Sequence, residues 1–239
     1  MPITLVTGAS RGIGRAISLR LARDGHEIIA VARKRDELAA LCAEIRSAGG
    51  RARAIVLDVT DAAAVERELG GRELGGIDVD VLVNNAGIGL LKPFMDTTPA
   101  EWHRMVGVNV NALYHVTRAV LPAMIAKRSG HVCTIGSISG RSAFPGGTCY
   151  AATKAFVTSW SESLLLEVRE SGVKVSVVMP GSVATSFSGR DPSPDDAWKL
   201  MPEDVADAVA YVVGTPPNVL VHRAEVRTLT SPPKKGSRG

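Results

Sequence analysis

The chain has 239 residues, a formal net charge of +4, 45% hydrophobic residues and 22% charged residues. This composition is typical of a globular protein with a buried core, and the length is common for a single α/β domain. Arginine and lysine are scattered and lack interleaved aromatic residues, so the charge does not indicate a nucleic-acid-binding protein.

The cysteines and the N-terminal sequence indicate the cellular compartment in which the protein is expected. Cys42, Cys133 and Cys149 have neither metal-ligand spacing nor an even count for disulfides. Cys133 lies in an apolar run and is predicted to be a buried thiol. The first residues form a strand pattern without the basic start of a signal peptide, and no apolar run reaches the ~18 residues of a membrane span. We therefore expect a cytoplasmic protein without a membrane partner.

Short aliphatic runs alternate with amphipathic stretches along the chain. Strands are predicted at 3–7, 27–32, 52–57, 79–83, 130–136, 173–179 and 219–227. This alternation predicts an α/β fold, a single Rossmann-type, doubly wound parallel sheet of about seven strands with helices on both faces. We expect one domain over residues 1–230 and a disordered tail over residues 231–239.

A tandem repeat precedes the fourth predicted strand. Arg67 to Gly71 reads Arg-Glu-Leu-Gly-Gly, and residues 72 to 76 repeat it. Paired glycines end helices, so the repeat is predicted to be a lengthened surface loop without chemistry of its own.

The first predicted strand leads into a glycine-rich turn, which a helix follows. Such a turn lets the backbone approach a pyrophosphate, which then lies at the helix N-terminus. The spacing G-x-x-x-G-x-G differs from the G-x-G-x-x-G fingerprint, so the motif alone also fits a tight turn without a ligand. Its place in the first βα unit favours a nucleotide site, and we assign to that site Gly8, Ser10, Arg11, Gly12, Ile13 and Gly14.

The sequence resembles the short-chain dehydrogenase/reductase family, whose first motif is T-G-x-x-x-G-x-G. Asn84 to Gly87 reads N-N-A-G, as the family does after its fourth strand. Further matches are an active-site asparagine, a catalytic serine, a Tyr-x-x-x-Lys pair and P-G-x-x-x-T. They correspond to Asn109, Ser137, Tyr150, Lys154, Pro180, Gly181 and Thr185. The motifs follow the family order over most of the chain.

The resemblance implies four catalytic residues, Asn109, Ser137, Tyr150 and Lys154. Tyr150 and Lys154 are four positions apart and share a helix face. A phenol has a pKa of about 10, and a nearby ammonium with a positive nicotinamide would lower that pKa. Tyr150 then exchanges a proton with the substrate oxygen, which Ser137 hydrogen-bonds. By resemblance, Lys154 also binds the nicotinamide ribose and Asn109 holds a relay water; alone, Asn109 also fits a capping residue.

The end of the second predicted strand indicates the cofactor. NAD-specific relatives carry an acid there, whereas this chain has Arg33, and its nearest acid, Asp36, is predicted inside the next helix. Guanidinium groups of Arg33 and Arg11 suit a 2′-phosphate, so NADP(H) is the expected cofactor. The alternative is that Arg33 and Lys34 are solvated charges at a helix start.

The resemblance implies further cofactor contacts after the later strands. They are Asp58, Val59, Asn85, Ala86, Gly87, Tyr150, Lys154, Pro180, Gly181, Val183 and Thr185. Asp58 alone also fits a capping residue at the following turn. The five histidines are isolated from one another and from carboxylate clusters, so no metal site is expected.

These features predict an NADP(H)-dependent oxidoreductase that interconverts a ketone or aldehyde and an alcohol by hydride transfer. The chain resembles 3-oxoacyl-thioester reductases but lacks their C-terminal D-G-G stretch, while its ending resembles small 3-hydroxy acid and sepiapterin-type reductases. A short lid over 186–200 disfavours a steroid-sized pocket. A 3-oxoacyl-thioester or small carbonyl substrate, a 3-hydroxy acid, and a non-catalytic NADP-binding regulator remain alternatives, although a regulator is expected to lose catalytic residues.

Assembly is also implied by the resemblance. In relatives, the helices corresponding to 99–128 and 148–171 pack across a two-fold axis. We therefore expect a homodimer or homotetramer, besides a small-molecule carbonyl or alcohol substrate. The side chains expected to supply part of that packing are Leu113, Val116, Val120, Phe156 and Leu164.

Overall fold

The computed structural model describes residues 1–70, 78–189 and 191–230. Within them, seven strands form one sheet in the order β3-β2-β1-β4-β5-β6-β7, and all neighbours are parallel. The strands are β1 (Ile3–Thr7), β2 (Glu27–Ala32), β3 (Arg51–Val56), β4 (Val81–Asn84), β5 (Gly130–Ile135), β6 (Val173–Pro180) and β7 (Arg223–Val226).

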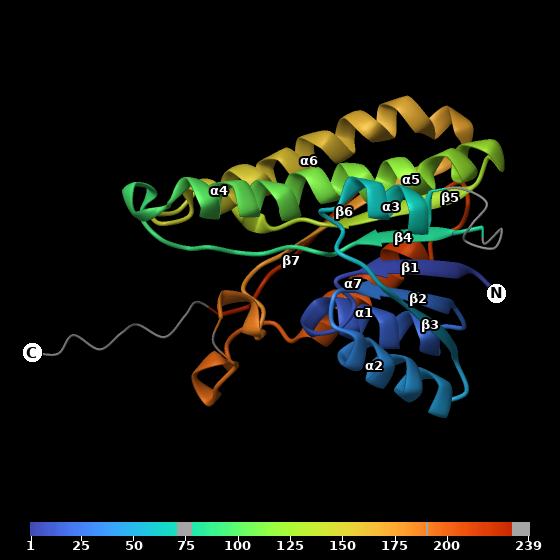
Figure 1. Ribbon diagram of the computed structural model, residues 1–239, viewed down its shortest axis with the longest axis horizontal. Helices are drawn as coiled ribbons and strands as arrows, with labels where there is room; N and C mark the ends of the chain where they lie inside the picture. Colours follow the sequence, from blue (N-terminus) through green and yellow to red (C-terminus); the bar gives the residue numbers. More distant parts are fainter. Residues whose placement is uncertain (71–77, 190, 231–239) are drawn as a thin grey trace, which may run out of the picture.

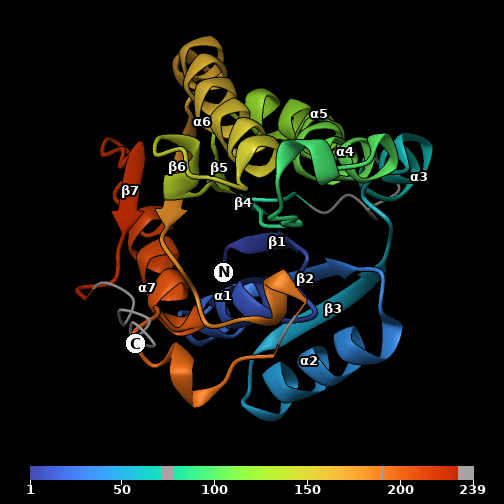
Figure 2. The same cartoon turned by 90° about the vertical axis from the view of Figure 1, so that its left-hand side faces the viewer.

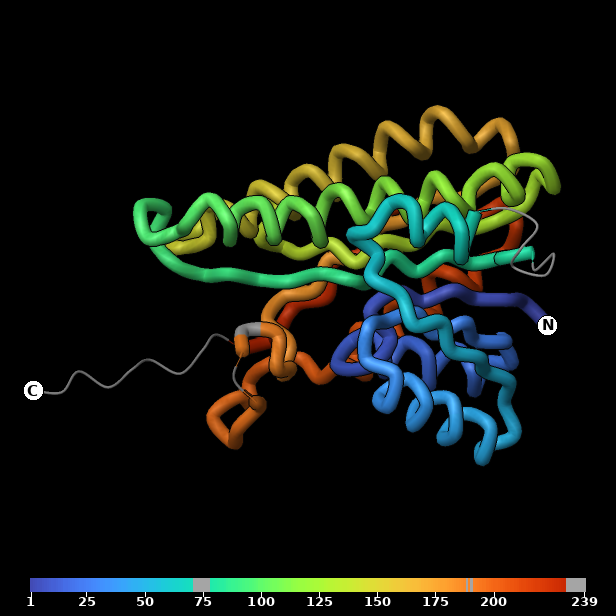
Figure 3. Tube along the Cα trace, viewed as in Figure 1, coloured from blue at the N-terminus to red at the C-terminus, as the bar shows by residue number. Residues whose placement is uncertain are grey.

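Helices cover both faces of this sheet (Figure 1). They are α1 (Gly12–Arg23), α2 (Arg35–Ser47), α3 (Ala62–Leu69), α4 (Pro99–Val106), α5 (Ala112–Ala126), α6 (Thr148–Val168) and α7 (Pro202–Val213). The blue helices α1 and α2 lie below the sheet, and the green and yellow helices α5 and α6 lie above it (Figure 3). The predicted fold class is confirmed.

The predicted strands differ from the observed ones mainly at their ends. The last strand covers only β7, because Val219 and Leu220 are 41% and 38% exposed and lie outside the sheet. Of the tandem repeat, the structure describes residues 67–70, where α3 ends and Gly70 follows as its C-cap. The rest of the repeat and the predicted tail, 231–239, lie outside the described residues.

Each strand buries alternate side chains on opposite faces of the sheet. In β2, Ile28 packs with α1, α2 and α7 on one face, while Ile29 packs with α3 and α5 on the other. Parallel strands covered on both sides must be aliphatic throughout, which is why these segments read as continuous apolar runs. Fully burying such a side chain stabilises the fold by ~1.5–3 kcal/mol.

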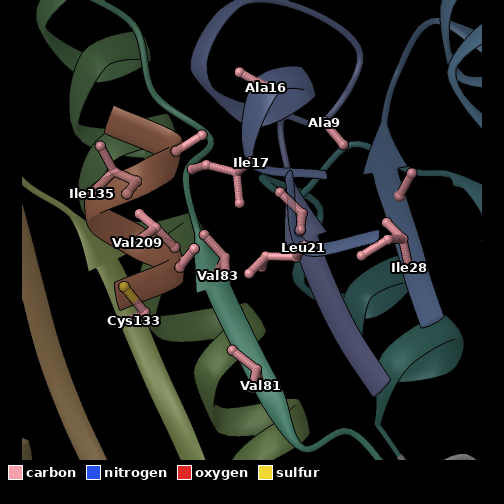
Figure 4. Packing of buried hydrophobic residues seen from close by; sticks show 14 of the residues in the cluster. Ala9, Ala16, Ile17, Leu21, Ile28, Val81, Val83, Cys133, Ile135 and Val209 are labelled. Atoms are coloured by element: carbon pink, nitrogen blue, oxygen red, sulfur yellow. The ribbon is translucent and has the colours of Figure 1, made fainter. Parts of the chain in front are cut away.

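The lower core brings two helices against the central strands. Figure 4 shows Ile17 and Leu21 of α1, and Val209 of α7, pointing towards Val83 and Cys133. Cys133 is fully buried, and burial raises the pKa of its thiol to about 12. The prediction of a buried core thiol is therefore confirmed.

The upper layer corrects one expectation. Leu113, Val116 and Val120 of α5 are only 6%, 1% and 4% exposed, because they pack inside this chain's own core. They are therefore not free to pack against a second copy, as the sequence had indicated. The exposed apolar side chains of α5 and α6 are Tyr114, Ile125, Phe156 and Leu166.

The topology creates a switch point at the carboxyl edge of the sheet. The chain proceeds from β1 outward to β3 in one direction, then returns and proceeds from β4 to β7 in the other. Loops leaving β1 and β4 therefore diverge to opposite faces, which opens a crevice where ligands of such sheets bind. Figure 2 shows the segment after β6 lying in front of the start of α1 at this edge. No helix among the described residues is long and apolar enough to cross a membrane.

Candidate active site

A cavity of about 840 Å³ lies at the carboxyl edge of the sheet. Segments far apart in the sequence contribute to it: the turns after β1, β2, β4, β5 and β6, and the start of α6. The predicted site residues that line it are Gly8, Ser10, Arg11, Gly12, Ile13, Arg33, Asp58, Val59, Asn85, Ala86, Gly87, Ser137, Tyr150, Lys154, Pro180, Gly181, Val183 and Thr185. Gly14 and Asn109 do not line this cavity.

The first turn needs its glycines for conformation and for close packing. Gly8 and Gly12 adopt left-handed φ values of 64° and 54°, which glycine adopts without a steric penalty. A Cβ on Gly14 would lie 2.3 Å from the backbone oxygen of Gly8. Gly14 therefore does not line the cavity, but its lack of a side chain lets the first turn of α1 pack directly against Gly8.

The N-N-A-G segment fastens this turn to β4. The Thr7 hydroxyl accepts hydrogen bonds from the backbone N–H groups of Asn85 and Ala86, both at 3.0 Å. In return, the Asn85 amide donates to the carbonyl oxygens of Thr7 and Gly8 at 2.9 and 3.2 Å. The shape of the turn is thus held by reciprocal hydrogen bonds between the segments that leave β1 and β4.

A basic side chain lies at the end of β2, where the cofactor preference was predicted. Arg33 is exposed, and its guanidinium lies 3.7 Å from the carboxylate of Asp58. Burial raises the pKa of Asp58, but hydrogen bonds from Thr60 and the charge of Arg33 outweigh it and lower that pKa. Asp36 lies in the first turn of α2, as predicted. The carboxylate of Asp58 accepts a hydrogen bond from the N–H of Thr60 in the following turn. The N-cap of α3 is Asp61, whose side chain accepts from the N–H of Ala64.

The catalytic candidates converge between β5 and α6. Ser137 follows β5, and its hydroxyl oxygen accepts a hydrogen bond from the N–H of Ser139 at 3.1 Å. Tyr150 and Lys154 lie one turn apart on α6. Lys154 is 6% exposed, and its ammonium donates to the carbonyl oxygen of Ile135 at 2.8 Å. Burial lowers the pKa of Lys154 to about 8.

The protein around Tyr150 raises the pKa of its phenol, whereas the expected lowering, which includes the positive nicotinamide, concerns the cofactor-bound site. Burial raises the pKa of the phenol, and a hydrogen bond with Ser137 opposes that rise only in part. The physical reason is desolvation, since a phenolate loses its water in this environment. Tyr150 is therefore held in its protonated form at neutral pH.

Asn109 lies in a wider helical turn, the π-helix η3 (Gly107–Asn111), between α4 and α5. Its side chain is 3% exposed; it accepts from the N–H of Ile88 and donates to the carbonyl of Ile88, both at 2.9 Å. It also donates to the hydroxyl of Thr153 at 3.0 Å. A Cβ on Gly87 would touch both Asn109 and Lys154, at 3.5 and 3.8 Å. Asn109 thus fixes the segment after N-N-A-G beside Lys154.

Sequence reasoning missed a second group of lining residues. They come from the segments after β4 and β5, from α4 and η3, and from the stretch between β6 and α7. They include Ile88, Leu91, Arg104, Val108, Ser142, Phe144, Phe187, Pro192 and Lys199. Most lie in loops, where no period indicates which way a side chain points. Among the residues that the structure describes, no group of His, Cys, Asp or Glu is arranged to hold a metal ion.

Comparison with known proteins identifies the family. The short chain dehydrogenase family matches residues 2–195. NADP-dependent 3-hydroxy acid dehydrogenase YdfG of Salmonella typhi is 36% identical over 95% of each chain. Sulfoacetaldehyde reductase 2 of Chromohalobacter salexigens is 37% identical over 94% of this chain and 93% of that protein. A closed form of serine dehydrogenase complexed with NADP+ has a TM-score of 0.85 and 36% identity over 94% of both chains. The chain therefore belongs to the short-chain dehydrogenase family.

Proposed function

We propose that this NADP(H)-dependent oxidoreductase interconverts small 3-hydroxy acids and the corresponding 3-oxo acids. NADP(H) is the cofactor that the sequence predicted, and it is named for the 3-hydroxy acid dehydrogenase and the serine dehydrogenase structure. The observation that carries the proposal is the cavity, which combines a basic lining with Ser137, Tyr150 and Lys154.

The residues at one end of the cavity fit a phosphorylated dinucleotide. Positive φ at Gly8 and Gly12 turns the backbone sharply, and the start of α1 has no side-chain cap on its N–H groups. Such N–H groups bind phosphate oxygens. The exposed Arg33 and neighbouring Arg11 suit a 2′-phosphate. When bound, the nicotinamide supplies or accepts the hydride.

The protein's own residues handle the proton. In reduction, Tyr150, protonated because burial raises its pKa, donates its proton to the carbonyl oxygen of the substrate. The Ser137 oxygen accepts the N–H of Ser139, and its hydroxyl hydrogen-bonds Tyr150. In the proposed mechanism this hydroxyl turns its hydrogen to the substrate oxygen as negative charge develops there. Lys154 stabilises the Tyr150 anion that results, by virtue of its charge one helical turn away.

The charge of the lining supports an acidic substrate. The basic side chains are Arg11, Arg33, Lys34, Arg104, Lys154 and Lys199. Among the described lining residues, Asp58 is the only carboxylate. Lys199 pairs with Asp196 at 2.7 Å, whereas Arg104 on α4 has no ion partner within the described part of the chain. Arg104 is thus available to a carboxylate, for which a guanidinium is well shaped.

The test measures kcat/KM with NADP+ for 3-hydroxybutanoate and for its neutral amide. We expect the acid to be preferred by about tenfold or more, since a charge-assisted hydrogen bond contributes ~1.5–3 kcal/mol. Equal values would contradict the substrate class. The control is Tyr150→Phe, which keeps the ring but should reduce turnover by ~10²–10⁴-fold while NADPH affinity stays within a few-fold. Unchanged turnover in that variant would contradict Tyr150 as the proton donor, whereas no turnover in the native protein would favour the regulator alternative.

We further propose a homodimer in the cytoplasm. Three free, buried cysteines support a reducing compartment. The exposed Tyr114 and Phe156, on the outer surfaces of α5 and α6, support packing between copies there. Light scattering at micromolar concentration tests this assembly, and a monomer would refute it.

A further inference from the structure

Between β6 and α7, residues 184–189 and 191–200 form a strap across the carboxyl edge of the sheet (Figure 2). Its two ends are joined. The N–H of Ala184 donates to the carbonyl of Leu200 at 2.8 Å, and the N–H of Leu200 donates to Ser182 at 2.9 Å. Because both ends are fixed at one place, the strap stays at the cavity, where Thr185, Phe187 and Pro192 are among its lining residues.

Phe187 lies on the strap, in the short helix η6 (Ser186–Ser188), and its ring contacts the catalytic candidate. The ring centroids of Phe187 and Tyr150 are 5.7 Å apart, with an angle of 64° between the planes. This edge-to-face arrangement is a favourable one for two aromatic rings. Phe187 and Tyr150 both line the cavity, so the contact lies where the substrate must approach the phenol.

Gly89 provides the second support for the Phe187 ring. A Cβ built on Gly89 would lie 2.2 Å from Cε1 and 2.9 Å from Cζ of Phe187. The ring therefore occupies the space that any other residue at position 89 would fill. Gly89 is itself well fixed, because the preceding residue, Ile88, is bound on both its N–H and carbonyl by Asn109.

We propose that Phe187, seated on Gly89 and against Tyr150, sets the upper size of the group that the reacting carbon carries. Phe187 is 42% exposed, and its ring borders the cavity beside the phenol. On this proposal, the site admits short, unbranched substrates and excludes branched or aromatic ones. This size limit rests on the proposed oxidoreductase function, but not on the acidity of the substrate. It makes Phe187 and Gly89 specificity-determining residues.

The first experiment uses neutral aldehydes, so that size is tested separately from charge. The ratio of kcat/KM for cyclohexanecarbaldehyde to kcat/KM for propanal is measured with NADPH. We expect Phe187→Ala to raise this ratio by about tenfold or more, as one misfitting carbon in a closed pocket changes specificity by ~10–200-fold. Phe187→Leu should give an intermediate rise. Tyr211→Ala, an exposed aromatic on α7 away from the cavity, is the matched control and should leave the ratio unchanged.

The second experiment moves Phe187 without altering it. In Gly89→Ala, the new methyl group meets the far end of a side chain, so the ring rotates away and the strap loses its seat. The size ratio should rise as in Phe187→Ala. Hydrogen–deuterium exchange over residues 184–189 should become faster in Gly89→Ala than in the native protein, with or without NADPH.

The outcomes separate the two proposals. A size ratio within twofold of the native value in both Phe187→Ala and Gly89→Ala overturns the size limit. Turnover of aldehydes without a preference for hydroxy acids contradicts the substrate class but leaves the size limit intact. If neither an aldehyde nor 3-hydroxybutanoate is turned over, the oxidoreductase function fails, and unchanged exchange in Gly89→Ala then also refutes the seating of Phe187.

Discussion

His131 makes the stability of the fold depend on pH. The imidazole is 4% exposed on β5, and its Nε2 lies 2.8 Å from the hydroxyl of Ser176. That hydroxyl donates its single hydrogen to the carbonyl of Val221 at 2.6 Å, so Nε2 must carry the proton and donate. The other nitrogen, Nδ1, is buried without a hydrogen-bond partner in the described part of the chain.

Protonation of His131 therefore places a charge where nothing accepts it. Burial, and next the charge of Lys174, lower the pKa of His131 to about 4. Since the folded protein has the lower pKa, the unfolded chain binds the proton first, and the free energy of unfolding falls as pH drops from 6.5 towards 4. From these two values the loss between pH 7 and pH 5 is about 2 kcal/mol, and it reaches about 3 kcal/mol below pH 4.

Urea unfolding followed by circular dichroism, at pH 7 and at pH 5, measures this loss. The matched variant is His131→Gln, which keeps an N–H donor for Ser176 but does not titrate. The fall in unfolding free energy between the two pH values should be about 2 kcal/mol smaller in the variant than in the native protein. An equal fall in both proteins would refute the assignment of this pH dependence to His131.

Three further outcomes follow from the site. Arg33→Ala should weaken NADPH binding by about 10- to 100-fold and leave NADH binding unchanged in calorimetry; equal effects on both would refute a 2′-phosphate contact. Gly14→Ala should abolish NADPH binding in a fluorescence titration, because its Cβ meets the Gly8 backbone at 2.3 Å; normal affinity would contradict this. Arg104→Gln should raise KM for 3-hydroxybutanoate by about tenfold but not KM for the neutral amide.

The sheet could be predicted from the sequence because parallel strands buried on both faces leave uninterrupted aliphatic runs. The predicted ends of the strands were less accurate, because a strand ends where its backbone N–H and C=O groups no longer have hydrogen-bond partners on a neighbouring strand. Val219 and Leu220 illustrate this, because they continue an apolar pattern yet extend past the paired residues of β7. The same limit explains α5: its period identifies an apolar face, but not whether that face meets the chain's own sheet or another copy.

The residues of the candidate site could be predicted where a sequence motif identifies them. Ser137, Tyr150 and Lys154 lie together because β5 and α6 bring them to one edge. The pKa of Tyr150 could not be anticipated, because desolvation depends on every group around the phenol. Phe187 was missed for a related reason, as its place over Gly89 depends on how the strap closes.

The wider turn at η3 constrains the length of the chain around Asn109. Helices α4 and α5 adjoin η3 without a break, so the three elements form one continuous helix. The wider turn offsets the faces of α5 from those of α4. Deleting one residue from this turn would rotate one half by about 100° and shift it by about 1.5 Å. Asn109 would then lose its two hydrogen bonds to the backbone of Ile88. Gly87 would no longer be held beside Lys154. Homologous chains should therefore vary in composition here, but not in the number of residues.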